Sequence, residues 1–318
     1  MKIEAIRTTP VLAPLPRPVR TASGTIDRFP LVLIDVDAGS GIVGRAYSQI
    51  YLAELLPALD CTLRALAEMI TGMALDPRAL HAHLLKRCRL LGAKNLVGIA
   101  LGGLDMALWD AWARAEGKPL ARALGAVPKP INAYNSVGLY DARSVSAIAE
   151  ETRAAGFAGL KIKVGFPSLA EDIAAVRAAR DALGNDIALM VDYNQSLDAT
   201  EAMLRCRALD AEGLEWIEEP VAADDLATCA RIADAVTTPI QMGENFNGLQ
   251  EMRAAIAARA ADLVMPDAQY IHGVTGWIEA AGSLRRAPLV LHDGAVSPSD
   301  APGIGIEWDE EAVARHRG

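Results

Sequence analysis

The chain has 318 residues, of which 52% are apolar and only 5% are aromatic, and it carries a formal net charge of −9. This apolar content excludes a disordered chain, and the length fits a barrel with a smaller companion domain. The acidic charge and the lack of a Lys/Arg-rich block argue against a nucleic-acid partner, because nothing would displace counterions from a phosphate backbone. We therefore expect a small-molecule substrate.

The first twenty residues are interrupted by four prolines and contain no uncharged run of membrane-spanning length. They predict a strand and a loop, and we expect no membrane segment and a cytoplasmic protein. The four cysteines, Cys61, Cys88, Cys206 and Cys229, form no CxxC pair. We predict buried free thiols, not a zinc site or a disulfide framework.

Residues 1–130 are predicted to form an α+β domain. Strand-like runs such as LVLIDV (31–36) alternate with Gly/Pro turns to about residue 50, which indicates a short antiparallel sheet. From about residue 52 to 124 the apolar spacing is helical, and Gly125, Pro128 and Pro130 end the stretch.

Residues 131–286 contain six short β-rich runs, from INAYNSV to DLVMPDAQ, each followed by an Ala/Leu-rich helical stretch. This alternation is typical of parallel βαβ units and predicts an α/β fold with a (β/α) TIM-type barrel. Five of the runs end in a polar residue, namely Lys163, Asp192, Glu218, Glu244 and Asp267. The ends of barrel strands converge on one face, where the βα loops form the active site.

Asp192, Glu218 and Glu244 follow one another at intervals of 26 residues, one acid per β/α unit. Three carboxylates that meet at a buried barrel mouth repel one another unless a cation neutralises them, and oxygen-only ligands select a hard ion such as Mg²⁺. Each acid alone could be a solvated loop residue, but together they predict a Mg²⁺ site.

Lys161 and Lys163 lie two residues apart on a predicted strand, so their side chains share one face. Neighbouring ammonium groups in a low-dielectric site lower each other's pKa, and a lysine with a lowered pKa can act as a base near neutral pH. The alternative, a solvated edge strand, fits poorly because Leu160, Ile162 and Val164 occupy the other face. These groups predict a site in which the metal and one lysine hold a substrate carboxylate while the other lysine removes the α-proton, giving an enediolate that the metal stabilises.

Several motifs in order identify a resemblance: KIKVG, VDYNQSLD, WIEEP, MGENF and MPDAQYIHGVTGW, with PVRTASGT near the N-terminus and PLVLHDGAVSPSDAPGIGIEWDE near the C-terminus. The chain resembles the mandelate racemase subgroup of the enolase superfamily over most of its length to about Gly282, and again over the C-terminal segment. The resemblance implies a barrel with an α+β capping domain and Mg²⁺-dependent α-proton abstraction from a carboxylate. Racemisation of a 2-hydroxy acid is favoured, and dehydration of an acid sugar is the alternative. We also expect a homo-oligomer.

Carried over residue by residue, the resemblance assigns the metal to Asp192, Glu218 and Glu244, the base to Lys163, substrate carboxylate binding to Lys161 with Asn194, and orientation of a histidine on the next strand to Asp267. It also implies that residues 18–25 belong to a mobile loop that closes over the substrate.

The pattern breaks after the sixth unit, because a barrel of this family has eight strands. In the family, the seventh strand brings the histidine partner of Asp267 and the eighth brings a glutamate for the substrate carboxylate. Here the chain passes near residues 282–287 directly to the family's C-terminal segment, so we predict that 287–318 return to the capping domain. An open six-stranded sheet exposes two edges, which favours a natural chain with a further segment. A true deletion that leaves a noncatalytic carboxylate- and metal-binding remnant stays open.

His292 lies 25 residues after Asp267, but its neighbours resemble the returning strand, and AAGSLRR is too short for a crossover helix and loop. We therefore do not assign it as a base. The remaining histidines, His81, His83, His272 and His316, are predicted to be structural or solvated.

Overall fold

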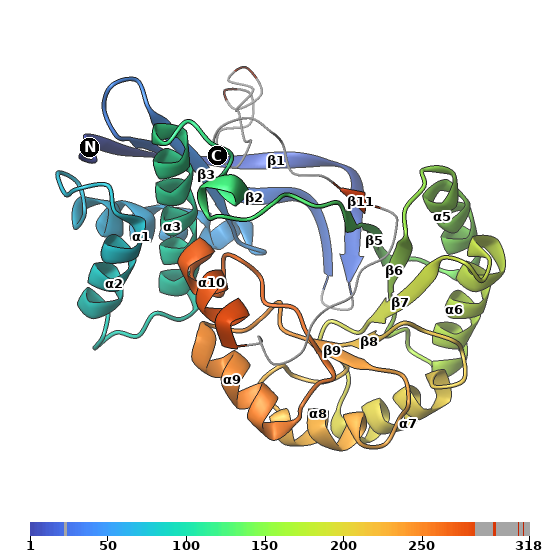
Figure 1. The fold of residues 1–318 in the computed structure, drawn as a ribbon. Coiled ribbons are helices and arrows are strands. Elements are labelled where there is room, and N and C mark those ends of the chain that lie inside the picture. The colour runs from blue at the N-terminus through green and yellow to red at the C-terminus, as the bar shows by residue number, and fades with distance from the viewer. Residues whose placement is uncertain (22–23, 284–294, 297–310, 312–313, 315–318) are drawn as a thin grey trace.

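The computed structural model describes residues 1–21, 24–283, 295–296, 311 and 314. It has a capping domain, which contains an antiparallel sheet, and a second domain whose parallel strands are backed by helices (Figure 1). Both predicted domain types are present, in the predicted order.

The capping sheet has the order β1-β2-β3, formed by β1 (Ala5–Thr21), β2 (Gly24–Asp37) and β3 (Val43–Gln49). β1 accommodates four prolines because an edge strand needs hydrogen bonds on one side only. Its register shifts between Pro14 and Val19. The loop prediction for residues 18–25 is therefore corrected: residues 18–21 and 24–25 are strand ends of a long hairpin, and residues 22–23 lie outside the described part.

The helical stretch predicted over residues 52–124 is confirmed. It contains η1 (Ala53–Leu55), α1 (Leu56–Glu68), α2 (Pro77–Arg87), α3 (Asn95–Ala115) and α4 (Leu120–Ala123). By length and composition α3 could cross a membrane, but 78% of its apolar stretch is buried inside the protein. The central helix of a folded domain meets the same two criteria, and α3 packs against β3 and α1 in this way.

The second domain has a parallel sheet of the order β10-β9-β8-β7-β6-β5 in the described part of the chain. Its strands are β5 (Tyr134–Leu139), β6 (Gly159–Lys163), β7 (Ala188–Asp192), β8 (Ile217–Glu218), β9 (Ile240–Met242) and β10 (Leu263–Val264). The helices that follow them are α5 (Ala142–Ala154), α6 (Leu169–Leu183), α7 (Ala199–Leu209), α8 (Leu226–Ala233), α9 (Leu249–Ala258) and α10 (Gly273–Ser283). The six predicted β/α units are all present, and α5–α9 cover the outer side of the curved sheet (Figure 1).

A short antiparallel pair joins β4 (Ile131–Asn132) to β11 (Ala295–Val296). These two residues of the C-terminal segment therefore lie beside the start of the second domain. Residues 284–294, which include the predicted break and His292, lie outside the described part, as does most of the tail.

The two faces of β6 separate as its sequence predicts. Leu160, Ile162 and Val164 are at most 1% exposed and belong to the core between the sheet and its helices, whereas Lys161 and Lys163 point to the inner side. Cys88, Cys206 and Cys229 are buried free thiols, as predicted. The prediction is wrong for Cys61, which is exposed on α1.

The loop between β10 and α10 joins the two domains. The Gln269 side chain accepts a hydrogen bond from the Gln49 backbone N–H at 2.5 Å and donates one to its carbonyl at 3.0 Å. Behind it, Asp105 of α3 accepts bonds from the Thr275 backbone N–H and hydroxyl at 2.8 and 2.7 Å. At the opposite side, the Tyr140 hydroxyl donates to the Pro18 carbonyl, so the β1–β2 hairpin reaches the barrel. The capping domain is thus fixed over the carboxyl ends of the strands.

Candidate metal centre and active site

The ends of three neighbouring strands align side by side. In the sheet register Lys163 of β6 is paired with Asp192 of β7, and Asp192 is paired with Glu218 of β8. Because paired residues of adjacent strands point to the same side of a sheet, the three side chains form one row on the inner face. The sequence predicted this convergence from strand ends alone.

Glu244 joins the row from the loop that follows β9. Oxygen atoms of Asp192, Glu218 and Glu244 lie within 4.8 Å of one another. The preceding Gly243 has φ +139°, and a Cβ there would lie 2.8 to 2.9 Å from the backbone of Met265. Glycine is therefore required for the close approach of β9 and β10 from which Glu244 turns inward.

The three carboxylates are crowded and largely removed from water. Asp192 and Glu218 are fully buried, and Glu244 is partly buried. Burial, followed by the charge of Asp192, raises the pKa of Glu218 to about 7 and also raises the pKa of Glu244. A cation would stabilise this cluster of three buried carboxylates in its charged form, and ligand atoms that are all carboxylate oxygens fit the preference of Mg²⁺.

The two lysines lie against these acids. Lys161 Nζ is 2.7 Å from each oxygen of Glu218 and 3.4 Å from Asp192, and Lys163 Nζ is 2.5 Å from Asp192 Oδ2. Burial lowers the pKa of Lys161, but the charges of Asp192 and Glu218 outweigh burial and raise it. The predicted lowering is therefore wrong for Lys161 in this structure, because its ammonium group contacts carboxylates directly.

Asn194 and Asp267 occupy different environments. Asn194 donates to Asp192 from its backbone N–H at 2.7 Å and from its amide at 3.1 Å, while its buried Oδ1 has no hydrogen-bond partner among the described residues. Asp267 is exposed, and the described residues give its carboxylate two backbone donors, Gln269 and Tyr270, and no histidine. Asn194 thus contacts one of the predicted metal ligands, whereas no described histidine is hydrogen-bonded to Asp267.

Two of the described histidines, His272 and His81, have structural environments. His272 Nε2 lies 2.7 Å from the Ala93 carbonyl oxygen at the domain junction, and its ring is 6.3 Å from that of buried His81.

Three further side chains surround the row and were not singled out from the sequence. Trp216 Nε1 donates to Glu218 Oε2 at 3.2 Å, and Lys161 Nζ lies 5.8 Å from the centre of the Tyr134 ring. Buried Glu219 accepts two bonds from Asn245, and burial together with Glu244 raises the pKa of Glu219 to about 8. Side chains two residues apart on a strand share a face, so Trp216 could have been identified from its position two residues before Glu218. Tyr134 could not, because its place beside Lys161 depends on the order of the strands in the sheet.

Comparison with known proteins identifies the family. Residues 2–125 match the model of the mandelate racemase / muconate lactonizing enzyme N-terminal domain, and residues 144–287 match the enolase C-terminal domain-like model. An L-Ala-D/L-Glu epimerase of Bacillus subtilis is 30% identical over 87% of this chain and 76% of its own length. The chain belongs to the mandelate racemase / muconate lactonizing enzyme family of the enolase superfamily.

Other relatives in this superfamily have names that denote different reactions. An L-talarate/galactarate dehydratase of Salmonella typhimurium is 36% identical over 59% of this chain, which spans 48% of the length of that relative. A D-galactarolactone cycloisomerase of Agrobacterium fabrum is 28% identical and aligns with 100% of this chain and 99% of its own. That alignment runs over 385 positions, 67 more than the 318 residues of this chain. The cycloisomerase therefore has residues with no counterpart here.

Solved structures of this enolase superfamily fold support the cofactor. An enolase from alpha proteobacterium bal199 with bound Mg²⁺ has a TM-score of 0.94 and 38% identity, over 100% of this chain and 99% of the other. An enolase from Bradyrhizobium, complexed with magnesium and mandelic acid, has a TM-score of 0.93 and 36% identity, over 100% and 98% of the two chains. Together with the carboxylate cluster, these neighbours show a Mg²⁺-dependent enzyme of the superfamily.

Proposed function

We propose that this enzyme removes the α-proton of a small carboxylic acid and that its reaction is racemisation of a 2-hydroxy acid. The observation that carries the proposal is the row of Lys163, Asp192 and Glu218 at adjacent strand ends, with Lys161 on the same face. A base, a carboxylate-binding cation and metal ligands then lie within reach of one substrate. The mandelic acid bound to the similar Bradyrhizobium enzyme supports a 2-hydroxy acid as the substrate class.

In this proposal Asp192, Glu218 and Glu244 hold Mg²⁺, which supplies the positive charge that stabilises a substrate carboxylate as negative charge builds up on it. Lys161 donates hydrogen bonds to the same carboxylate, and Asn194 assists from its amide. Lys163 accepts the α-proton on one face of the substrate.

Inversion requires a second base on the opposite face. Asp267 is suited to orient a histidine, and that histidine is proposed to come from a seventh barrel strand, which the given sequence lacks. With Lys163 alone, the enzyme exchanges the α-proton of one enantiomer without inverting it.

Dehydration of an acid sugar is the second candidate. The 36% identity with the L-talarate/galactarate dehydratase favours this reaction. The proposed site is compatible with it, because loss of a β-hydroxyl begins with the same abstraction of the α-proton. A binding protein without proton transfer is a third account, and it predicts ligand binding with no exchange.

Incubation of the enzyme with Mg²⁺ and each mandelate enantiomer in D₂O tests the proposal, with α-deuterium incorporation followed by proton NMR. Lys163→Ala is expected to abolish exchange from one enantiomer and to leave Mg²⁺ binding in place, whereas Lys118→Ala, at an exposed lysine, leaves both unchanged. Exchange at the parental rate in Lys163→Ala would identify another base. Parallel incubation with galactarate, scored for a keto product, distinguishes the dehydratase.

A further inference from the structure

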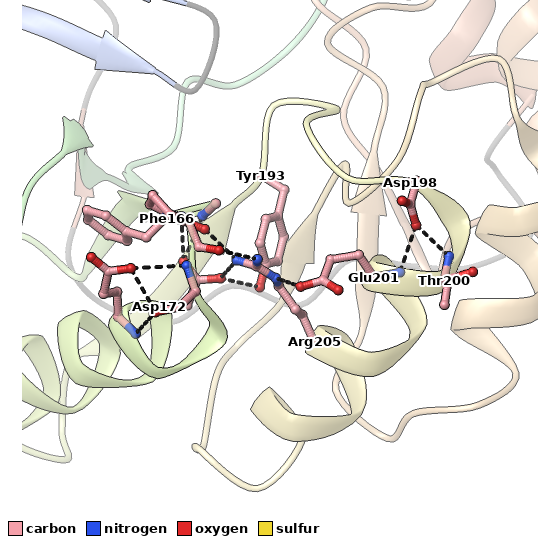
Figure 2. Close-up of polar contacts among 11 residues, drawn as sticks. Phe166, Asp172, Tyr193, Asp198, Thr200, Glu201 and Arg205 are labelled. Atoms are coloured by element: carbon pink, nitrogen blue, oxygen red, sulfur yellow. Dashed lines mark hydrogen bonds and ion pairs between the residues drawn. The ribbon is translucent and has the colours of Figure 1, made fainter.

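A buried ion pair lies behind the metal centre and joins two of the loops that carry site residues. Asp172 of α6 and Arg205 of α7 are 0% and 4% exposed, and Arg205 Nη1 lies 2.7 Å from Asp172 Oδ2 (Figure 2). The Tyr193 hydroxyl donates to the same carboxylate oxygen at 3.2 Å. Tyr193 is fully buried and directly follows Asp192 in the chain.

The other oxygen of Asp172 holds the loop after β6. Oδ1 accepts the backbone N–H groups of Gly165 and Phe166 at 2.8 and 2.9 Å, two and three residues after Lys163. From the opposite side, Arg205 Nη1 donates to the Phe166 carbonyl at 2.8 Å. The ion pair therefore fixes both the donors and an acceptor of one short backbone segment (Figure 2).

The loop after β6 also packs directly on the loop after β7. Gly165 has φ +99°, and a Cβ there would lie 2.8 Å from Ser196 Oγ and 3.6 Å from the Tyr193 ring. The Val164 N–H donates to the Asp192 carbonyl at 3.0 Å. A shift of either loop would thus be transmitted to the other.

We propose that Asp172, Arg205 and the Tyr193 hydroxyl are positioning residues, which set the placement of Lys163 relative to Asp192 by locking the two loops together. A buried ion pair adds little net stability over apolar side chains of similar volume, whereas its hydrogen bonds fix defined backbone atoms. This inference rests on the proposed roles of Lys163 as base and Asp192 as metal ligand.

The test compares Asp172→Asn, Arg205→Lys and Tyr193→Phe with Leu183→Ala. Leu183 is a buried apolar residue at the C-terminal end of α6, 11 residues after Asp172, and its truncation is expected to destabilise the same helix while leaving the hydrogen bonds of Asp172 in place. Three quantities are measured for each variant: the melting temperature, the Mg²⁺ affinity by calorimetry, and kcat and KM for α-deuterium exchange.

We expect the Asp172 and Arg205 variants to lose about 10–100-fold in Mg²⁺ affinity, the range found when groups that orient metal ligands are removed. We expect kcat to fall by a similar factor, since displacement by about 1 Å costs about 100-fold, and to fall more than KM rises. Tyr193→Phe, which removes a single hydrogen bond and retains the ring, should show a smaller loss of the same kind. Leu183→Ala should lower the melting temperature and leave both quantities at parental values below it.

If the network variants lose only melting temperature, as Leu183→Ala does, the ion pair is structural and the inference is wrong. Tyr193→Phe and Arg205→Lys keep the test decisive if Asp172→Asn does not fold. If the parent exchanges no substrate, the proposed function fails, and Mg²⁺ affinity still decides the positioning role of the ion pair.

Discussion

Glu244 reaches the metal centre from beyond the end of its strand, unlike Asp192 and Glu218, which are the last residues of theirs. Its carboxylate nevertheless lies within the same cluster of oxygens. Glu244→Gln keeps the shape of the side chain and removes one negative charge. We expect its Mg²⁺ affinity to fall by at least about 100-fold, because even groups that only orient a ligand are worth about 10–100-fold.

Calorimetric titration measures this effect. Glu215→Gln is the matched control, because Glu215 is an exposed carboxylate at the entry to β8 and is expected to leave the affinity unchanged. Parental affinity in Glu244→Gln would remove Glu244 from the ligand set.

Asp105 predicts a pH dependence of stability at the domain junction. Burial raises its pKa to about 7 from an ordinary value of 3.8, although hydrogen bonds from Thr275 oppose the increase. The folded state therefore binds more protons than the unfolded state between about pH 4 and 7. The stability contributed by Asp105 is present below pH 4 and is lost as the pH rises through 7.

Urea unfolding of the parent and of Asp105→Asn at pH 5 and pH 8 tests this sign. The neutral amide does not titrate, so the parent should lose more stability between the two pH values than the variant does. The active-site carboxylates titrate in both proteins, so their contribution cancels when the change in unfolding free energy of the variant is subtracted from that of the parent. Equal losses in both proteins would show that Asp105 does not carry the effect.

At the scale of elements, α3 of the capping domain approaches the loop between β10 and α10 closely at Gly102. A Cβ on Gly102 would overlap the carbonyl oxygen of Gln269, in the loop that also carries Asp267. We expect Gly102→Ala to push this loop away from α3 and to destabilise the protein by about 1–3 kcal/mol, the usual cost of overpacking, despite the better helix propensity of alanine.

Thermal unfolding and the KM for the substrate acid measure the displacement. Gly98→Ala lies one turn earlier on α3, where the new Cβ would be 3.0 Å from the Ala93 carbonyl oxygen and 3.3 Å from His272 Nε2. Because its neighbours need to move much less, Gly98→Ala should cost less stability and leave KM unchanged. An equal effect of the two substitutions would contradict a specific contact at Gln269.

At the scale of the whole molecule, the described sheet has six parallel strands where the TIM-type barrel closes with eight. We predict that the natural protein contains on the order of 40–50 further residues near Gly282–Ala287, from two units of barrel-like length. The alignment with the cycloisomerase, 67 positions longer than this chain, is in keeping with such a difference.

Intact mass spectrometry of the protein from its native source tests the prediction. A mass several kDa above 33.7 kDa would support the additional units. A mass equal to that value would indicate a true deletion and would argue against racemisation, leaving exchange by Lys163 on one face.

The sequence alone determined much of this protein because the barrel repeats a simple pattern. The alternation of short apolar runs with helical stretches predicted all six described β/α units, and the polar residues at the strand ends predicted the metal cluster. The side-chain alternation of a strand was enough to place Lys161 and Lys163 together on the inner face of β6.

Only the tertiary structure decided properties that depend on contacts between segments distant in the chain. The charges of Asp192 and of Glu218, which lie on other strands, outweigh burial and raise the pKa of Lys161, where its proximity to Lys163 in the sequence suggested a decrease. Residues 18–21 extend a strand because β2 supplies a pairing partner in spite of the prolines. The ion pair of Asp172 with Arg205 gave no local signal, since the two residues are neighbours only after α6 and α7 pack on the sheet.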